Sequence, residues 1–157
     1  MVFLKSRKGK AKTVFGIYWY LTRGKENVDR VIASDFINLE ASELWYRDMD
    51  LTRIENDNNR YKGGRGADAR TYNHYIISPN PTDNIDLDTL RVLATEWAYE
   101  HFGDYEIAII YHNDNKNGIP HAHVVVNNTN LVTGNRCNRS EERRVRKECR
   151  SRWSPYH

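Results

Sequence analysis

The sequence is poor in cysteine and in long apolar runs. Its 157 residues include only two cysteines, Cys137 and Cys149. These two fit neither a disulfide framework nor a cysteine metal motif, which favours a reducing cytoplasm. No stretch approaches the ~20 apolar residues of a membrane span, and the N-terminus lacks the apolar core of a signal peptide. The length suits a single cytoplasmic domain with one core.

The sequence also lacks a strong net charge outside its last residues. The whole chain has 24 lysines and arginines against 21 aspartates and glutamates, and 7 of the basic and 3 of the acidic residues lie within Arg139–His157. The remainder therefore holds 17 basic and 18 acidic residues. Such a body is not a globally basic nucleic-acid binder, so any DNA-binding surface must come from local clusters of basic residues.

The most informative stretch is Ala108–Asn127, in which two apolar runs flank a polar, glycine-containing loop. This pattern predicts two strands joined by a turn. His121 and His123 are two positions apart and so share one strand face, while Ala122 faces the other side. An antiparallel hairpin would bring His112 beside His121. Three imidazoles on one face form a set of ligands suited to a divalent metal ion.

This motif, His112-x-Asp114 followed by Pro120-His121-Ala122-His123, resembles the metal-binding motif of relaxases of the MobA/VirD2 type. These nucleases belong to the superfamily named for its histidine–hydrophobe–histidine pair, and the resemblance runs from about Phe15 to about Asn138. It implies a bound divalent ion, with Mg²⁺, Mn²⁺ and Zn²⁺ all left open. Asp114 either orients a histidine ligand as part of the catalytic site or simply occupies the turn.

A candidate nucleophile lies near the N-terminus. The apolar spacing within Lys10–Arg23 predicts a helix that ends before Gly24. Tyr18 and Tyr20 face different directions on it, and periodicity does not choose between them. Relaxases of this type carry a nucleophilic tyrosine in a pattern similar to Tyr20-Leu-Thr-Arg-Gly-Lys. The resemblance therefore selects Tyr20.

The remaining pattern predicts an α+β fold. We expect a short strand within Asn27–Phe36, a helix to about Asn58, a strand over Thr71–Ser78, a helix that ends near Gly103, the two histidine strands, and a third strand after a turn at Thr133-Gly134. This order predicts an antiparallel sheet with helices packed on one side. The resemblance implies the palm-like sheet of relaxases, incomplete at its C-terminus.

Contacts to DNA are assigned to basic residues near the predicted site. The cluster Lys5–Lys12 is either a frayed, solvated N-terminus or a DNA-binding segment. We assign Lys8, Lys10, Lys12 and Arg23 to single-stranded DNA. His74 resembles a strand histidine of relaxases and is included with them, although it is equally well explained as a half-buried strand residue.

These assignments predict a metal-dependent DNA relaxase that nicks single-stranded DNA at the transfer origin of a plasmid or mobile element, through a 5′-phosphotyrosine intermediate. Accessory mobilisation proteins are possible partners. The alternatives are a metal-dependent nuclease that uses water and a non-catalytic module that binds single-stranded DNA. A replication initiator of the same superfamily is less suitable, because its tyrosine typically lies on a helix after the histidine pair.

The last segment, Arg139–His157, differs from the rest in composition. It has no hydrophobic periodicity, as expected of a basic disordered extension that grips DNA. The run also closely resembles the translation of an adapter oligonucleotide used in short-read sequencing, and departs from it only at Arg146. The sequence therefore predicts a relaxase domain over 1–138, truncated, and a non-native read-through tail over 139–157 that makes few contacts with the body.

Overall fold

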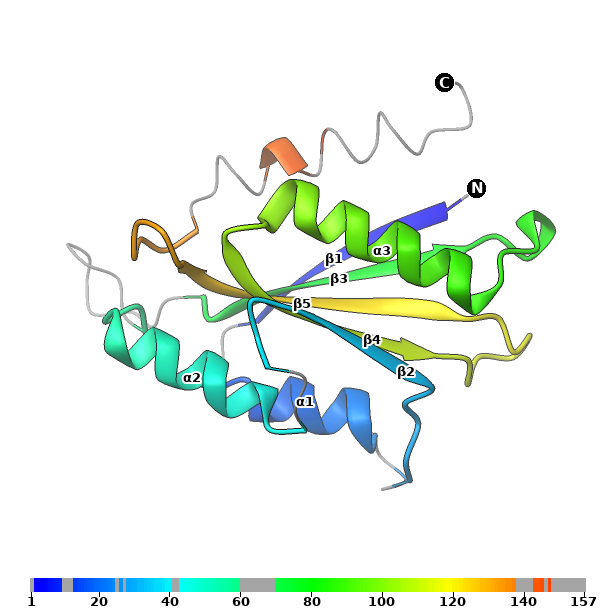
Figure 1. Cartoon of the computed structure of the whole chain (residues 1–157). Coiled ribbons are helices and arrows are strands. Elements are labelled where there is room, and N and C mark those ends of the chain that lie inside the picture. The colour runs from blue at the N-terminus through cyan, green and yellow to red at the C-terminus, as the bar shows by residue number, and fades with distance from the viewer. Residues whose placement is uncertain are drawn as a thin grey trace.

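The chain is built on a five-stranded antiparallel sheet (Figure 1). The computed structural model describes residues 2–9, 13–24, 26, 28–40, 43–59, 70–137, 143–145 and 147. The strands are β1 (Val2–Gly9), β2 (Ala33–Ile37), β3 (Tyr72–Pro79), β4 (Tyr105–His112) and β5 (His121–Asn130). Their spatial order is β1-β3-β5-β4-β2, so the two strands that carry the histidine motif are neighbours near the centre of the sheet.

Helices cover both faces of this sheet. α1 (Phe15–Thr22) and α2 (Trp45–Glu55) lie on one face, and α3 (Leu87–Phe102) lies on the other, after the short 3₁₀ turn η1 (Pro81–Asp83) (Figure 1). The predicted α+β class and antiparallel sheet are confirmed, whereas the single-sided layer of helices is wrong. All eight residues of β4 are buried. A strand that is apolar on both faces needs a cover on each of them, which explains the second helical layer.

The alternation of side chains along β5 separates two cores. Ala122 and Val124 pack with α3, in a cluster that includes Leu90, Ala94 and Trp97 of that helix. Val125 packs on the opposite face with residues of the two other helices and of β4, namely Leu21, Trp45, Met49 and Ile110. His121 and His123 have the same parity as Val125. The histidine motif therefore faces α1 and α2.

A buried polar network holds α2 against this face. Arg53 is fully buried, and its Nη1 donates a hydrogen bond to Asn127 Oδ1 on β5 (3.0 Å). Asn127 Nδ2 donates in turn to Glu106 Oε1 (3.0 Å). Burial raises the pKa of Glu106, which the hydrogen bonds to its carboxylate only partly offset. Since each buried group has a partner, the network anchors α2 without leaving a charge alone.

The termini of several predicted elements differ from the observed ones. Residues 2–9, which include the start of the Lys5–Lys12 cluster, form strand β1 and pair with β3, so this part of the cluster is not a frayed end. The first helix begins at Phe15 rather than near Lys10. Within the described residues, the expected strand after Asn127 is reduced to an isolated bridge between Thr129 and Arg136, because β5 itself continues to Asn130.

The described part of the tail contacts the body at Val145. Residues 143–145 form a helical turn, and Val145 is fully buried in the core cluster on the α3 face. We expected a tail with few contacts to the body, and Val145 makes one such contact. Among the described helices, none is long and apolar enough to cross a membrane.

Candidate metal centre and nucleophile

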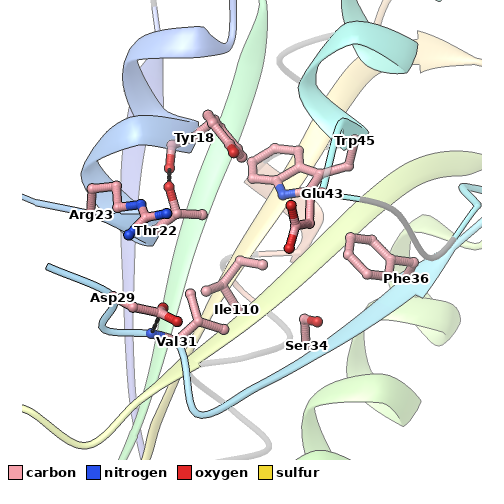
Figure 2. A pocket seen from close by; sticks show the side chains of 10 residues that line it. All are labelled: Tyr18, Thr22, Arg23, Asp29, Val31, Ser34, Phe36, Glu43, Trp45 and Ile110. Atoms are coloured by element: carbon pink, nitrogen blue, oxygen red, sulfur yellow. Dashed lines mark hydrogen bonds between the residues drawn. The ribbon is translucent and has the colours of Figure 1, made fainter. Parts of the chain in front are cut away.

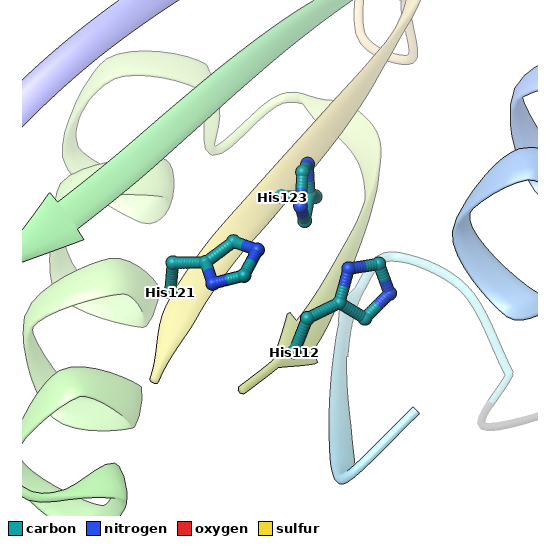
Figure 3. A group of neighbouring side chains, drawn as sticks. All are labelled: His112, His121 and His123. Atoms are coloured by element: carbon teal, nitrogen blue, oxygen red, sulfur yellow. The ribbon is translucent and has the colours of Figure 1, made fainter. Parts of the chain in front are cut away.

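Three histidines converge on the sheet face that α1 covers, and Figure 3 shows their three rings close together. His112 at the end of β4 lies directly opposite His121 at the start of β5, and His123 follows two residues later on the same face. One ligand nitrogen from each ring lies within 4.8 Å of the other two. Ala122 is buried on the opposite face, as predicted. The predicted hairpin register therefore brings the three rings together.

Each ring has one nitrogen engaged by the protein, which leaves the other for a ligand. His112 Nε2 donates a hydrogen bond to the carbonyl oxygen of Leu21 (2.5 Å), and its buried Nδ1 has no hydrogen-bond partner. His121 Nδ1 donates to the carbonyl oxygen of Ile119 (3.4 Å). His123 Nδ1 contacts His74 and its buried Nε2 has no partner. Buried nitrogens without partners are costly unless something binds them, so the donor set fits a divalent metal ion.

His74 supports this set from β3. Its Nε2 lies 2.9 Å from His123 Nδ1, and its side chain is only 3% exposed. Its burial agrees with the interpretation of His74 as a strand residue, and its assignment to DNA stays a prediction. A proton on His123 Nδ1, donated to His74, leaves the lone pair of His123 Nε2 for a metal. Histidine ligands are commonly oriented in this way through their second nitrogen.

The site favours neutral imidazoles. Burial lowers the pKa of His112 to about 4, and the nearby Arg30 adds to this effect while the carbonyl of Leu21 opposes it. Burial and the neighbouring histidines lower the pKa of His123 to about 2. The pKa of His121 is also lowered, again chiefly by burial. All three rings are then uncharged near neutral pH, which is the form that binds a cation.

These shifts predict an acid-sensitive fold in the absence of metal. The unfolded chain takes up a proton on His112 near pH 6.5, whereas the folded chain does so only near pH 4. The stabilisation is therefore complete above pH 6.5 and is lost as the pH falls through this window. We expect His112 alone to account for about 3 kcal/mol of unfolding free energy between these limits. Denaturant unfolding with chelator at several pH values measures it. A His112→Gln variant with the same pH profile as the unchanged protein would contradict the assignment.

Tyr20 and Tyr18 occupy different surroundings on α1. Tyr18 packs in an aromatic cluster, with ring centroids 4.3 Å from Tyr46 and 5.5 Å from Trp45. Tyr20 is 43% exposed, with the guanidinium of Arg30 5.3 Å from its ring centroid. The residue after it, Leu21, is the one whose carbonyl contacts His112. Tyr20 thus lies on the turn of α1 that contacts the histidine site, and its ring is accessible.

Asp114 follows β4, two residues after His112. Its Oδ2 accepts a hydrogen bond from Arg30 Nε (2.7 Å) rather than from a histidine ring. Burial opposes its ionisation, but the hydrogen bond and charge of Arg30 more than offset this, and the pKa of Asp114 is lowered. Asp114 is therefore a carboxylate at the rim of the histidine site, and Arg30 is its direct partner.

Two hollows border this part of α1. One, of about 380 Å³, lies between α1, β2 and the start of α2, and its walls include Tyr18, Glu43 and Trp45 (Figure 2). The other, of about 560 Å³, is lined by Tyr20, Arg30 and Asp114. Arg23, predicted to bind DNA, is exposed and lines both. Of the predicted lysine contacts, Lys8 lies on β1, and Lys10 and Lys12 lie outside the described residues.

Comparison with known families identifies the chain. The family model for relaxases, described as a MobA/VirD2-like nuclease domain, matches residues 20–153. The chain belongs to this relaxase family. The match begins at Tyr20 and includes the whole histidine motif. No curated protein matches this relaxase in a sequence search.

Solved structures share the fold of this relaxase. The Mn-bound MobM relaxase domain (MOBV; Mob_Pre) with 23 nucleotides of plasmid pMV158 oriT DNA, at pH 6.5, superposes with a TM-score of 0.66 at 17% identity, over 99% of this chain and 82% of that one. A structure described as "Molecular Basis of Vancomycin Resistance Transfer in Staphylococcus aureus" gives 0.58 at 16% identity, over 96% and 89%. Identities this low establish a common fold.

Proposed function

We propose that this relaxase nicks single-stranded DNA at the transfer origin of a plasmid or mobile element, with a divalent metal ion bound by His112, His121 and His123. The observation that carries the proposal is the convergence of three histidine rings, with one ligand nitrogen of each within 4.8 Å of the other two. The family match and the oriT DNA bound by the MobM relaxase domain support the substrate.

The metal ion would supply positive charge at the phosphodiester, whose negative oxygens otherwise resist attack. Mn²⁺ is favoured because the MobM relaxase domain is Mn-bound in structures at pH 6.5, 5.5 and 4.6. The low pKa values of His112 and His123 agree with metal binding over that range, since protons compete with a metal only near or below these values.

Tyr20 is the proposed nucleophile. Its phenolic oxygen bonds to phosphorus while the bond from phosphorus to the 3′ oxygen breaks, and that oxygen leaves as a hydroxyl with the proton that the phenol gives up. The product is a 5′-phosphotyrosine, whose formation keeps the bond energy and allows the strand to be rejoined. The exposed ring of Tyr20 and the contact between its neighbour Leu21 and His112 support this choice over Tyr18.

An adduct assay with labelled DNA tests the proposal. Randomised single-stranded oligonucleotides of about 25 nucleotides, close to the 22–26 nucleotides in the MobM structures, are incubated with the protein and Mn²⁺. A 5′-phosphotyrosine keeps the 3′ part of the strand on the protein. A 3′ label should therefore move with the denatured protein, and a 5′ label should not. Cleavage without an adduct would identify a nuclease that uses water, and binding without cleavage would identify a non-catalytic module.

Binding of single-stranded DNA should depend steeply on salt. The body has almost no net charge, so the affinity must come from local contacts such as Arg23 and the lysines near β1. The logarithm of the binding constant should fall linearly with the logarithm of salt concentration, by roughly 0.7 for each phosphate contacted. Arg23→Gln, Lys8→Gln, Lys10→Gln and Lys12→Gln should each reduce the slope by about that amount. Fluorescence anisotropy at several salt concentrations measures it.

The control for these variants is Arg91→Gln, because Arg91 lies on α3, which packs on the face of the sheet opposite the histidines. Its slope should equal that of the unchanged protein. A binding constant indifferent to ionic strength would contradict the assignment of these basic residues.

A further inference from the structure

Arg30 joins the helix that carries Tyr20 to the loop that follows His112. Its Nη1 donates a hydrogen bond to the carbonyl oxygen of Tyr20 (2.8 Å). Its Nε donates to Asp114 Oδ2 (2.7 Å). The guanidinium carbon lies 5.3 Å from the centroid of the Tyr20 ring. One side chain therefore contacts both the backbone and the ring of the nucleophile, as well as the carboxylate beside the metal ligands.

The backbone around Arg30 is held at both ends. Its own amide donates to the carbonyl oxygen of Thr22 at the end of α1 (3.3 Å), and the amide of Ile32 donates to the carbonyl oxygen of Tyr111 on β4 (3.0 Å). Tyr111 directly precedes His112. The backbone of residues 30–32 is thus hydrogen-bonded both to the end of α1 and to β4, the strand that carries His112. These bonds hold the Cα atom of Arg30 in place.

Gly24 makes room for this arrangement. A Cβ atom built on Gly24 would lie 3.1 Å from both Cδ and Nη1 of Arg30, and the φ angle of Gly24 is +67°. A larger residue there would both strain the backbone and press on the guanidinium. Gly24 therefore has two roles: it adopts the positive φ angle that follows the end of α1, and it leaves space for the side chain of Arg30.

We propose that Arg30 is a positioning residue that fixes the Tyr20 hydroxyl relative to the histidine site. This inference rests on the proposed function. Arginine suits the task because its planar group donates in two directions at fixed angles, whereas lysine offers a single charged point. The side chains of Arg30 and Asp114 are 19% and 42% exposed, so the ion pair adds little to stability. Its effect should instead appear in the rate, since a small displacement of an attacking group can slow a reaction about 100-fold.

The first test compares Arg30→Lys, Asp114→Asn and the double variant. We expect each single change to slow adduct formation at saturating DNA about 10- to 100-fold, with DNA affinity, Mn²⁺ affinity and unfolding midpoint unchanged within twofold or a few degrees. Because the two residues act as a unit, the double variant should be no slower than Arg30→Lys alone. Additive losses, or an Arg30→Lys protein with the full rate, would overturn the inference.

The chain offers a matched control pair. Arg91 on α3 donates two hydrogen bonds to Asp35 on β2, at 3.1 and 2.7 Å, and the two side chains are 40% and 23% exposed. Arg91→Lys and Asp35→Asn should leave the adduct rate unchanged. A similar loss of rate in these variants would show that any surface ion pair matters, and would also overturn the inference.

A second readout does not depend on activity. Amide hydrogen exchange in the last turn of α1 and at Gly24 should be faster in Arg30→Lys than in the unchanged protein, while β4 and β5 exchange at the same rate. Unchanged exchange in this turn would contradict a positioning role. If the unchanged protein forms no adduct at all while its exchange responds to Arg30→Lys, the proposed function fails and Arg30 is shown to be a structural clamp only.

Discussion

Replacing Tyr20 by phenylalanine is expected to abolish the covalent adduct and to leave DNA binding intact. The change removes only the hydroxyl oxygen that would bond to phosphorus, so adduct formation should fall by at least about a thousandfold. The ring of Tyr20 is 43% exposed and α1 is held by other contacts, so the unfolding midpoint should change little. A denaturing gel with 3′-labelled oligonucleotide measures the adduct, and fluorescence anisotropy measures binding.

Tyr18→Phe is the matched control for this variant. Tyr18 packs against Tyr46 and Trp45, so loss of its hydroxyl should leave the adduct in place. An adduct that persists in Tyr20→Phe and disappears in Tyr18→Phe would reverse the assignment. Loss of DNA binding in Tyr20→Phe would instead show that the ring is a platform for a base rather than a nucleophile.

Replacing a histidine of the site should remove both the metal and the reaction. In His123→Gln the ring nitrogen with no protein partner disappears from a buried position of the site. We expect Mn²⁺ affinity to fall by more than the roughly 10- to 100-fold that follows loss of an outer partner of a metal ligand. Adduct formation should fall with it, and a chelator should have the same effect on the unchanged protein. Calorimetric titration with Mn²⁺ measures the affinity.

Two further histidine variants serve as comparisons for His123→Gln. His74→Gln should lower Mn²⁺ affinity by only about 10- to 100-fold, because His74 contacts His123 and supplies no ligand atom of the three. His101→Gln, on α3, should change nothing, because α3 packs on the opposite face of the sheet. Full Mn²⁺ affinity in His123→Gln would contradict the metal centre.

The histidine site could be predicted from local pattern because it depends on short-range geometry. His121 and His123 are two residues apart on a strand, and one hairpin brings His112 beside them. Strand alternation and antiparallel pairing are sufficient to predict that arrangement. The burial of the rings, which lowers their pKa values, depends on helices packed over the face and has no such local signal.

Features that join distant segments were not predictable in the same way. Arg30 contacts Asp114, 84 positions later, and His74 contacts His123, 49 positions later. Strand β1 carries three basic residues in its eight, VFLKSRKG, and lacks the apolar alternation that predicts a strand. It is specified by pairing with β3. The helices on both faces of the sheet do have a local signal. The continuous apolar run at Ala108–Tyr111 is typical of a strand buried on both sides.

Mass spectrometry of the adduct tests the central claim most directly. The protein is incubated with single-stranded oligonucleotide and Mn²⁺, denatured, and digested with protease and nuclease. The account predicts one modified peptide, which contains Tyr20 and carries nucleotide through a 5′ phosphate on the phenolic oxygen. Cleaved DNA with free 5′ phosphates and an unmodified Tyr20 peptide, or nucleotide attached to any other residue, would contradict it.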